Sequence, residues 1–184
     1  TIITKYRLWM RNSATYQDYP TSHHIRAVKS SHTYAEDVSS TYTIINTENS
    51  VSSWARAYST SIANSTDYKE FVIDNPGLYR TYIIKVTEST KTHGSYANSS
   101  YVGIGQVAYY SGHDGLYNLD YTIEAGGSAQ ETNGTAFARN EHTNGQRSPG
   151  LAFNNVTSHT DCWVGSNQPS ANDRLPTWLG FQFD

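Results

Sequence analysis

Apolar and polar side chains alternate residue by residue along much of this chain, and this pattern limits the folds that it can adopt. The stretch TIITKYRLWM places Tyr6 and Leu8 on one side of an extended backbone, and LPTWLGFQFD does the same with Phe181 and Phe183. A period of two is typical of a strand that buries one face. Such runs are bounded by turn residues, have no helical period between them, and occupy residues 2–10, 23–30, 41–47, 52–60, 68–74, 78–87, 101–110 and 177–183. The pattern predicts an all-β sandwich or jelly roll.

Composition supports an all-β chain and bears on its partners. Fifteen tyrosines and four tryptophans accompany one methionine, and the residues that favour helices are scarce. A length of 184 residues suits one domain. Charged residues make up only 16% and the net charge is −3, so electrostatics predict neither nucleic acid nor an anionic membrane as a partner. No apolar run approaches the ~18 residues of a membrane span, so we expect no membrane insertion.

The cysteine count and the glycosylation sequons bear on the compartment. Cys162 is the only cysteine, so no disulfide forms within the chain, and we expect it to be a small buried hydrophobe. Four N-x-S/T sequons are candidate glycosylation sites, at Asn64, Asn98, Asn133 and Asn155. Low charge with abundant Tyr, Ser, Thr and Asn is typical of extracellular and fibre proteins. We therefore expect an extracellular protein or one on a particle surface.

Five segments follow the order of a β-sandwich family when the chain is read from its last part onward. They are SPGLAFNNVTSHTDCWVGS, TWLGFQFD, IITKYRLW, FVIDNPGLYRTYIIKVT and VGIGQVAYY. Together they resemble the discoidin family, also called the coagulation-factor C-terminal or galactose-binding-like domain. Residues 141–184 resemble the N-terminal half of the family, residues 1–110 resemble its C-terminal half, and residues 111–140 connect the two. The resemblance implies one galactose-binding-like jelly-roll β-sandwich over residues 1–184, in circularly rotated order.

The rotated order leaves three ways to complete the sandwich. Joining Asp184 to Thr1 restores a nearly uninterrupted family sequence, so the chain is a circularly permuted monomer, a repeat cut from a longer polymer, or a subunit completed by its neighbour. Half a sandwich presents unpaired strand edges that a partner can satisfy, and head-to-tail contacts of this kind build filaments. We therefore expect a non-enzymatic adhesion or structural module, a fibre subunit that assembles with copies of itself by strand complementation. The alternative is a discrete lectin-like module, and either form suits a phage or virus fibre.

The chain has no set of residues typical of an active site, so we expect no enzymatic activity. His23 and His24 are adjacent in a predicted strand, so their side chains should point to opposite faces and cannot chelate one metal ion. The resemblance implies a calcium ion held by carboxylates at positions that are Asn154 and Gln106 here. Calcium prefers several charged oxygens, so we expect no tight calcium site and no other cofactor.

The resemblance also implies that glycans bind loops at one end of the sandwich, with galactose-type sugars as the ligands. Aromatic faces and polar side chains recognise sugars by stacking and by hydrogen bonds to hydroxyls. The candidate residues in the corresponding loops are Tyr16, Asp18, His142, Asn144, Arg147, Asn172 and Arg174. The tryptophans lie in or beside predicted strands and are expected in the core: Trp9, Trp54, Trp163 and Trp178.

Overall fold

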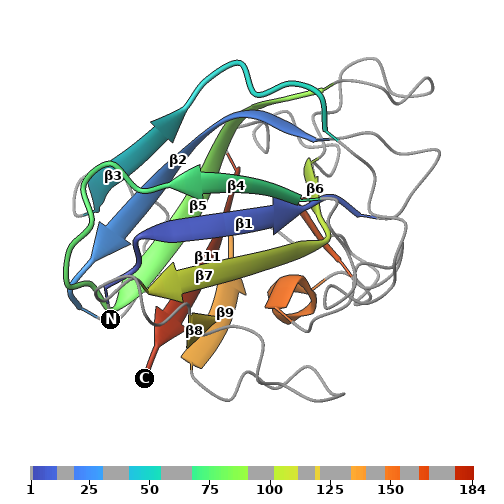
Figure 1. Ribbon diagram of the computed structural model, residues 1–184. Coiled ribbons are helices and arrows are strands. Elements are labelled where there is room, and N and C mark those ends of the chain that lie inside the picture. Colours follow the sequence, from blue (N-terminus) through green and yellow to red (C-terminus); the bar gives the residue numbers. More distant parts are fainter. Residues whose placement is uncertain are drawn as a thin grey trace.

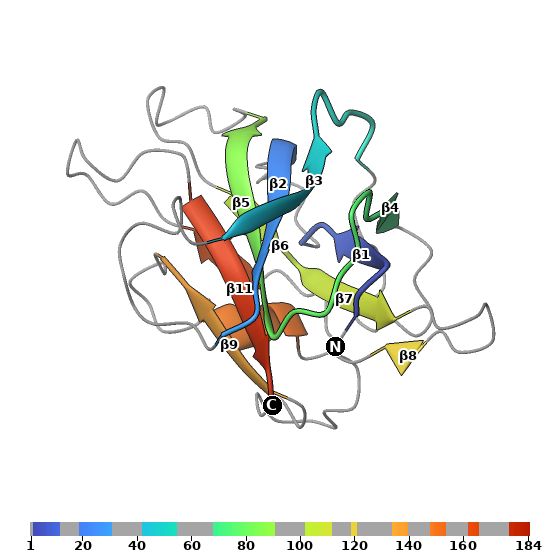
Figure 2. The same ribbon diagram turned by 90° about the vertical axis from the view of Figure 1, so that its left-hand side faces the viewer.

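Two antiparallel β-sheets pack face to face in the computed structural model of the protein (Figure 1, Figure 2). The structure describes residues 2–11, 19–30, 42–54, 68–90, 102–111, 119–120, 134–139, 148–153, 162–165 and 177–184. Within these residues nearly all regular structure is β, and the helical content is the short 3-10 helix η2 (Pro149–Phe153). The prediction of an all-β chain is confirmed.

The first sheet has four strands in the order β4-β1-β7-β8. Their bounds are β4 (Tyr68–Val72), β1 (Lys5–Trp9), β7 (Gln106–Ser111) and β8 (Leu119–Asp120). β1 pairs with both neighbours, so that Tyr6 stands opposite Phe71 on β4 and Tyr109 on β7. Because side chains alternate along a strand, Tyr6 is buried in the core while Lys5 and Arg7 point away from it.

The second sheet has five strands in the order β3-β2-β5-β11-β9. Their bounds are β3 (Thr43–Glu48), β2 (Pro20–Val28), β5 (Thr81–Ser89), β11 (Thr177–Phe183) and β9 (Gly134–Ala138). β11 lies between β5 and β9 and pairs antiparallel with both, so a strand from the end of the chain is interior in this sheet. A separate pair joins β10 (Trp163–Gly165) to β6 (Val102–Ile104).

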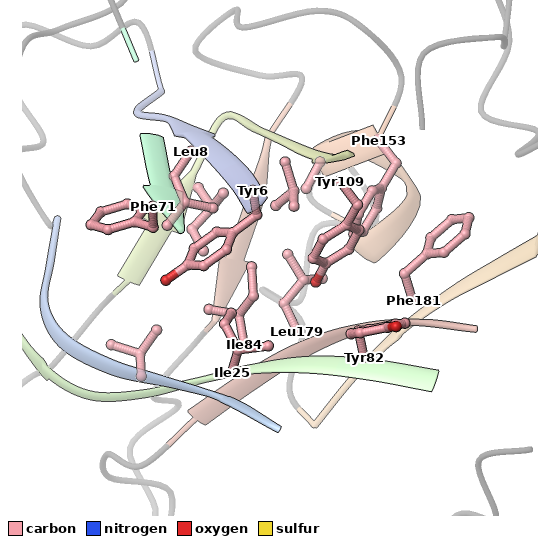
Figure 3. Packing of buried hydrophobic residues seen from close by; sticks show 14 of the residues in the cluster. Tyr6, Leu8, Ile25, Phe71, Tyr82, Ile84, Tyr109, Phe153, Leu179 and Phe181 are labelled. Atoms are coloured by element: carbon pink, nitrogen blue, oxygen red, sulfur yellow. The ribbon is translucent and has the colours of Figure 1, made fainter. Parts of the chain in front are cut away.

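The main hydrophobic core fills the space between the two large sheets (Figure 3). Side chains from residues 1–110 and from residues 141–184 both contribute to it. Aromatic rings are prominent: the ring of Phe153 lies 6.4 Å from that of Tyr109 and 4.9 Å from that of Phe181. The strong bias toward aromatic residues in the sequence is therefore explained in part by this packing.

The stretch YVGIGQVAYY, predicted as one strand over residues 101–110, forms two strands in different sheets. β6 ends at Ile104 and β7 begins at Gln106, so the chain changes sheet at Gly105. A Cβ at Gly105 would lie 2.9 Å from the carbonyl carbon and oxygen of Met10, which is too close. The prediction of a single strand was wrong, because this close approach of two backbone segments leaves no trace in local alternation.

The predicted strand over residues 52–60 is also corrected where the structure describes it. Residues 52–54 lie outside any strand, and residues 55–60 lie outside the described part of the chain. Trp54 is only partly buried, and its Nε1–H donates to the carbonyl oxygen of Pro20 at 2.8 Å. Its ring lies 6.2 Å from that of Phe71, so the segment packs against the core without joining a sheet.

The segment expected to connect the two halves, residues 111–140, contributes a strand to each large sheet. β8 pairs with β7, and β9 pairs with β11. Phe137 and Ala138 of β9 are buried. The two ends of the chain lie at the same end of the sandwich in both views (Figure 1, Figure 2).

Candidate functional site

The residues predicted to bind glycans or carry glycans lie outside the described part of the chain. They are Tyr16, Asp18, His142, Asn144, Arg147, Asn172 and Arg174 for the glycan site, and Asn64, Asn98, Asn133 and Asn155 for the sequons. Asn154, one of the two positions used in the calcium argument, also lies outside it. The structure therefore neither brings these residues together nor separates them, and they stay predictions.

Other residues singled out in the sequence are described. Trp9, Trp163 and Trp178 are buried as predicted, and so is Cys162. Gln106 is fully buried, and its Nε2 donates to the carbonyl oxygen of Val107 at 3.1 Å. In the described residues, no group of three or more His, Cys, Asp or Glu side chains could hold a metal ion. No helix in these ranges is long and apolar enough to span a membrane.

The most developed polar arrangement on the surface is the outer cation–tyrosine cluster, which we define as Lys5, Arg7, Tyr68, Glu70 and Tyr110. It lies on the face of β4, β1 and β7 that points away from the core, in the front layer of Figure 1. The register explains the grouping, because Arg7 pairs with Glu70 across β1 and β4, and Lys5 pairs with Tyr110 across β1 and β7. Strand pairing thus places five side chains from three distant segments on one face.

Arg7 is the centre of this cluster and is held from several sides. Its Nε–H donates to Oε2 of Glu70 at 2.7 Å, and its Nη1 donates to the hydroxyl of Tyr110 at 3.1 Å. Its Cζ lies 4.2 Å from the ring centroid of Tyr68 and 4.7 Å from that of Tyr110. A guanidinium between two aromatic rings gains cation–π attraction and loses rotamer freedom on folding. Arg7 is therefore fixed in place before any ligand arrives.

Lys5 and Arg7 share one carboxylate oxygen. The Nζ of Lys5 lies 3.3 Å from Oε2 of Glu70, the same oxygen that accepts from Arg7. Burial raises the pKa of Glu70, but hydrogen bonds from Arg7 and Lys5 outweigh it and lower that pKa below its usual value. Burial also lowers the pKa of Arg7, but the bond to Glu70 and the electrostatic interactions with Tyr110, Tyr68 and Glu70 together outweigh it, so the net shift is upward. Arg7 and Glu70 therefore both stay charged over the physiological range.

Several polar atoms of the cluster have no hydrogen-bond partner among the described residues, so a ligand can bind them. A guanidinium has five N–H donors; Glu70 and Tyr110 take two from Arg7, which leaves three. Oε1 of Glu70 has no partner among the described residues. The side chains of Lys5, Arg7 and Glu70 are 21%, 25% and 34% exposed, so solvent reaches each of them. Fixed donors and an acceptor on an open face suit a polar, hydroxyl-rich ligand.

A second polar arrangement is buried between the sheets, and we call it the inner histidine network: Tyr6, His23, Asn46 and Glu48. Nδ2 of Asn46 donates to the hydroxyl of Tyr6 at 3.3 Å and to Oε1 of Glu48 at 2.9 Å. The Tyr6 hydroxyl lies 2.7 Å from Nε2 of His23. The direction of this bond follows the histidine tautomer, because a neutral imidazole Nε2 either accepts the hydroxyl proton or donates its own.

The inner histidine network has little contact with solvent. His23 is 0% exposed, and its neighbour His24 is half-buried on the opposite face, as strand alternation predicts. Burial, with a smaller contribution from the charge of His24, lowers the pKa of His23 to about 3. Burial likewise raises the pKa of Tyr6 well above its usual value. A neutral histidine bonded to a neutral tyrosine is a structural element of the core at physiological pH.

The sequence analysis missed the outer cation–tyrosine cluster, although the alternating pattern contained a signal for it. Lys5, Arg7 and Trp9 alternate along one strand, and Tyr68, Glu70 and Val72 alternate along another. Each pattern marks a face, but only the pairing of β1 with β4 turns the two faces into one surface. The chain matches no protein-family model, no curated protein and no solved structure.

Proposed function

We propose that the protein is a non-enzymatic extracellular adhesion module that binds glycans through the outer cation–tyrosine cluster. The observation that carries this proposal is Arg7, a guanidinium held between Tyr68 and Tyr110 with three N–H donors unused by the described residues. Sugars present adjacent hydroxyls, and a rigid planar donor can bond two of them at low cost in conformational entropy. The predicted loop residues would form a separate glycan site at the end of the sandwich.

The discoidin resemblance supports the same class of function. That family combines a β-sandwich with non-enzymatic binding, and the described residues form two packed antiparallel sheets. A carbohydrate-binding module also needs a rigid scaffold under its binding face. β1, which carries Lys5 and Arg7, is paired on both sides, so its backbone is fixed by β4 and β7.

Assembly into a fibre by strand complementation is the other form of adhesion that the sequence predicts. That mechanism needs an unpaired strand edge. The strands nearest the two ends of the chain, β1 and β11, both lie between two neighbours of the same chain. We therefore propose the discrete glycan-binding module ahead of the strand-complemented fibre. In the fibre, the binding partners would be further copies of the same chain.

A glycan array on the purified protein tests the proposal, followed by titration calorimetry with the best ligand. We compare wild type with Arg7→Gln, which removes the guanidinium, and with Lys29→Gln as the matched control. Lys29 is exposed beyond the end of β2, on the other sheet, so its loss changes net charge equally without touching the cluster. Arg7→Gln should weaken binding about tenfold or more, since a charged hydrogen bond contributes roughly 1.5–3 kcal/mol.

Two results would contradict this function. One is the absence of binding to any glycan on the array. The other is binding that Arg7→Gln leaves unchanged while a loop variant such as Arg147→Ala or Arg174→Ala abolishes it, which would move the site to the predicted loops. Light scattering on the same samples reports assembly, and a monodisperse particle of 20.5 kDa would exclude the fibre form.

A further inference from the structure

We infer that the outer cation–tyrosine cluster selects acidic glycans, binding the carboxylate or sulfate of a charged sugar through Arg7 and Lys5. This inference rests on the proposed glycan-binding function and names its ligand class. It follows from three properties of the cluster: an excess of positive charge, a guanidinium already oriented for an anion, and an exposed apolar residue beside it.

The charge balance among the described side chains of the cluster favours an anion. Two cations, Lys5 and Arg7, face a single carboxylate, Glu70, and both approach the same oxygen at 3.3 and 2.7 Å. One positive charge is therefore uncompensated on a partly desolvated face. The two cations also lie close enough together, through their shared oxygen, to approach one anionic group. A neutral sugar would leave that charge excess unused.

The orientation of Arg7 favours a planar or tetrahedral anion over a single hydroxyl. Two parallel N–H bonds from a guanidinium match a carboxylate or sulfate, and such charge-assisted pairs are roughly twice as strong as neutral bonds. Arg7 donates one N–H to Glu70 and one to Tyr110, so the other three N–H groups of the guanidinium can supply a two-bond contact. The rings of Tyr68 and Tyr110 hold the guanidinium in place, so little rotamer entropy is lost on binding.

An exposed apolar side chain lies next to the cations. Val72 pairs directly with Lys5 across β1 and β4, and it is 68% exposed. Alternation puts Val72 on the same face as Glu70 and Tyr68. Sugar rings have an apolar side formed by C–H groups, and Val72 offers an apolar contact for it. The cluster thus combines an anion contact with an apolar surface, which fits a charged sugar better than a free inorganic anion.

Matched polymer pairs test the inference by biolayer interferometry with the intact protein. Dextran sulfate is compared with dextran, and polygalacturonate with its methyl ester, so that only the charged group differs within each pair. Wild type should bind at least one charged polymer about tenfold or more tightly than its neutral counterpart, and the pair that responds identifies sulfate or carboxylate. Binding should weaken from 0.1 to 1 M salt, as the Debye length falls from ~10 to ~3 Å.

Variants give a sharper test, because the effect of Glu70→Gln on affinity should be opposite for charged and for neutral glycans. Arg7→Lys keeps the charge and loses the two-bond fork, so binding to the charged polymer should fall several-fold. Glu70→Gln removes the negative charge beside the cations, so it should strengthen binding to the charged polymer several-fold. For a neutral glycan, the same variant loosens Arg7 and should weaken binding. Lys29→Gln should leave both unchanged.

Each outcome bears on one of the two proposals. Equal binding to charged and neutral polymers, or weaker binding of the charged polymer by Glu70→Gln, overturns the acidic-glycan inference. If Arg7→Gln still abolishes binding in that case, the proposed glycan-binding function stands. Failure of every polymer and every glycan to bind overturns both. Thermal unfolding of each variant confirms that it is folded, because an exposed ion pair contributes little to stability.

Discussion

Acidification should destabilise this protein through His23, and the size of the effect follows from its burial. His23 is fully buried on β2, where Tyr6 of β1 and Phe71 of β4 contact its ring, and Asn46 of β3 bonds to the same Tyr6 hydroxyl. The charged or titratable groups nearest to it are Tyr6, the adjacent His24 and the network member Glu48. Desolvation lowers the pKa of His23 to about 3 in the folded protein. The unfolded chain has a histidine pKa of about 6.5.

The sign of the effect is set by which state binds the proton. Between pH 6.5 and 3 the unfolded chain is protonated at His23 and the folded protein is not. Stability therefore falls as the pH falls through this window, and little of the effect is present at pH 7. Using 1.36 kcal/mol for each pKa unit, the loss between pH 7 and pH 5 is about 2 kcal/mol for this one residue.

Urea unfolding at pH 5, 6 and 7 measures this loss in wild type, His23→Gln and His24→Gln. Other groups also titrate, so the informative quantity is the difference in unfolding free energy between wild type and each variant. For His23→Gln that difference should shrink by about 2 kcal/mol from pH 7 to pH 5, because the variant has no histidine to protonate at this position. His24→Gln is the adjacent control on the outer face and should change far less. A difference for His23→Gln that is the same at pH 5 and pH 7 would refute the reasoning.

Three further predictions concern stability, each measured by chemical unfolding at pH 7. Tyr109→Phe should be neutral or stabilise the protein by about 1 kcal/mol, because the buried Tyr109 hydroxyl has no partner in the described structure. Tyr6→Phe should cost about 1–3 kcal/mol, because it breaks the hydrogen bonds to His23 and Asn46. A larger loss of stability for Tyr109→Phe than for Tyr6→Phe would contradict this. Gly105→Ala should cost about 3 kcal/mol, because the added Cβ would clash with the backbone of Met10. Gly180→Ala should cost less, because its Cβ would meet only the ring of Phe137 and the side chain of Ile83, which can move. Equal costs for the two variants would argue against the backbone clash. Joining the two ends of the chain with a short linker should leave the fold intact. The closed chain should be more stable by up to about 5 kcal/mol than a linear chain with the same added residues. A loss of stability would show that the linker cannot bridge the ends without distorting the fold.

Local alternation predicted the strands well where each strand stays in one sheet. β1, β2, β4, β5 and β11 all lie within or overlap the runs marked by a period of two. The change of sheet at Gly105 escaped prediction, because the alternation continues across it and its cause is the approach of Met10 from a distant segment. Alternation along a strand indicates which side chains share a face, but it does not indicate which distant backbone segment packs against that strand.

The two polar arrangements show the same limit at the level of sites. Adjacent positions predicted that His23 and His24 face opposite ways, but not that His23 would be the buried one. Its partner Tyr6 is 17 residues away, and Arg7 and Glu70 are separated by 63. Both arrangements depend on strand pairing, which no local pattern specifies. The loop candidates came instead from resemblance, and they lie outside the described residues.

The two ends of the chain are anchored at Tyr82 of β5 and at Arg80 just before that strand, and this bears on the rotated order. The amide of Ile3 donates to the hydroxyl of Tyr82 at 3.3 Å, and the ring of Phe183 lies 5.8 Å from the ring of Tyr82. Phe183 also exchanges hydrogen bonds with Arg80, at 2.9 Å from its amide and 3.0 Å to its carbonyl oxygen. A chain that closes on itself and a fibre that exchanges β11 between neighbours would make these same contacts. Exchange would only repeat between chains the pairing that β1 and β11 already make within one chain, so the fibre needs a high protein concentration and the discrete module is favoured when the protein is dilute.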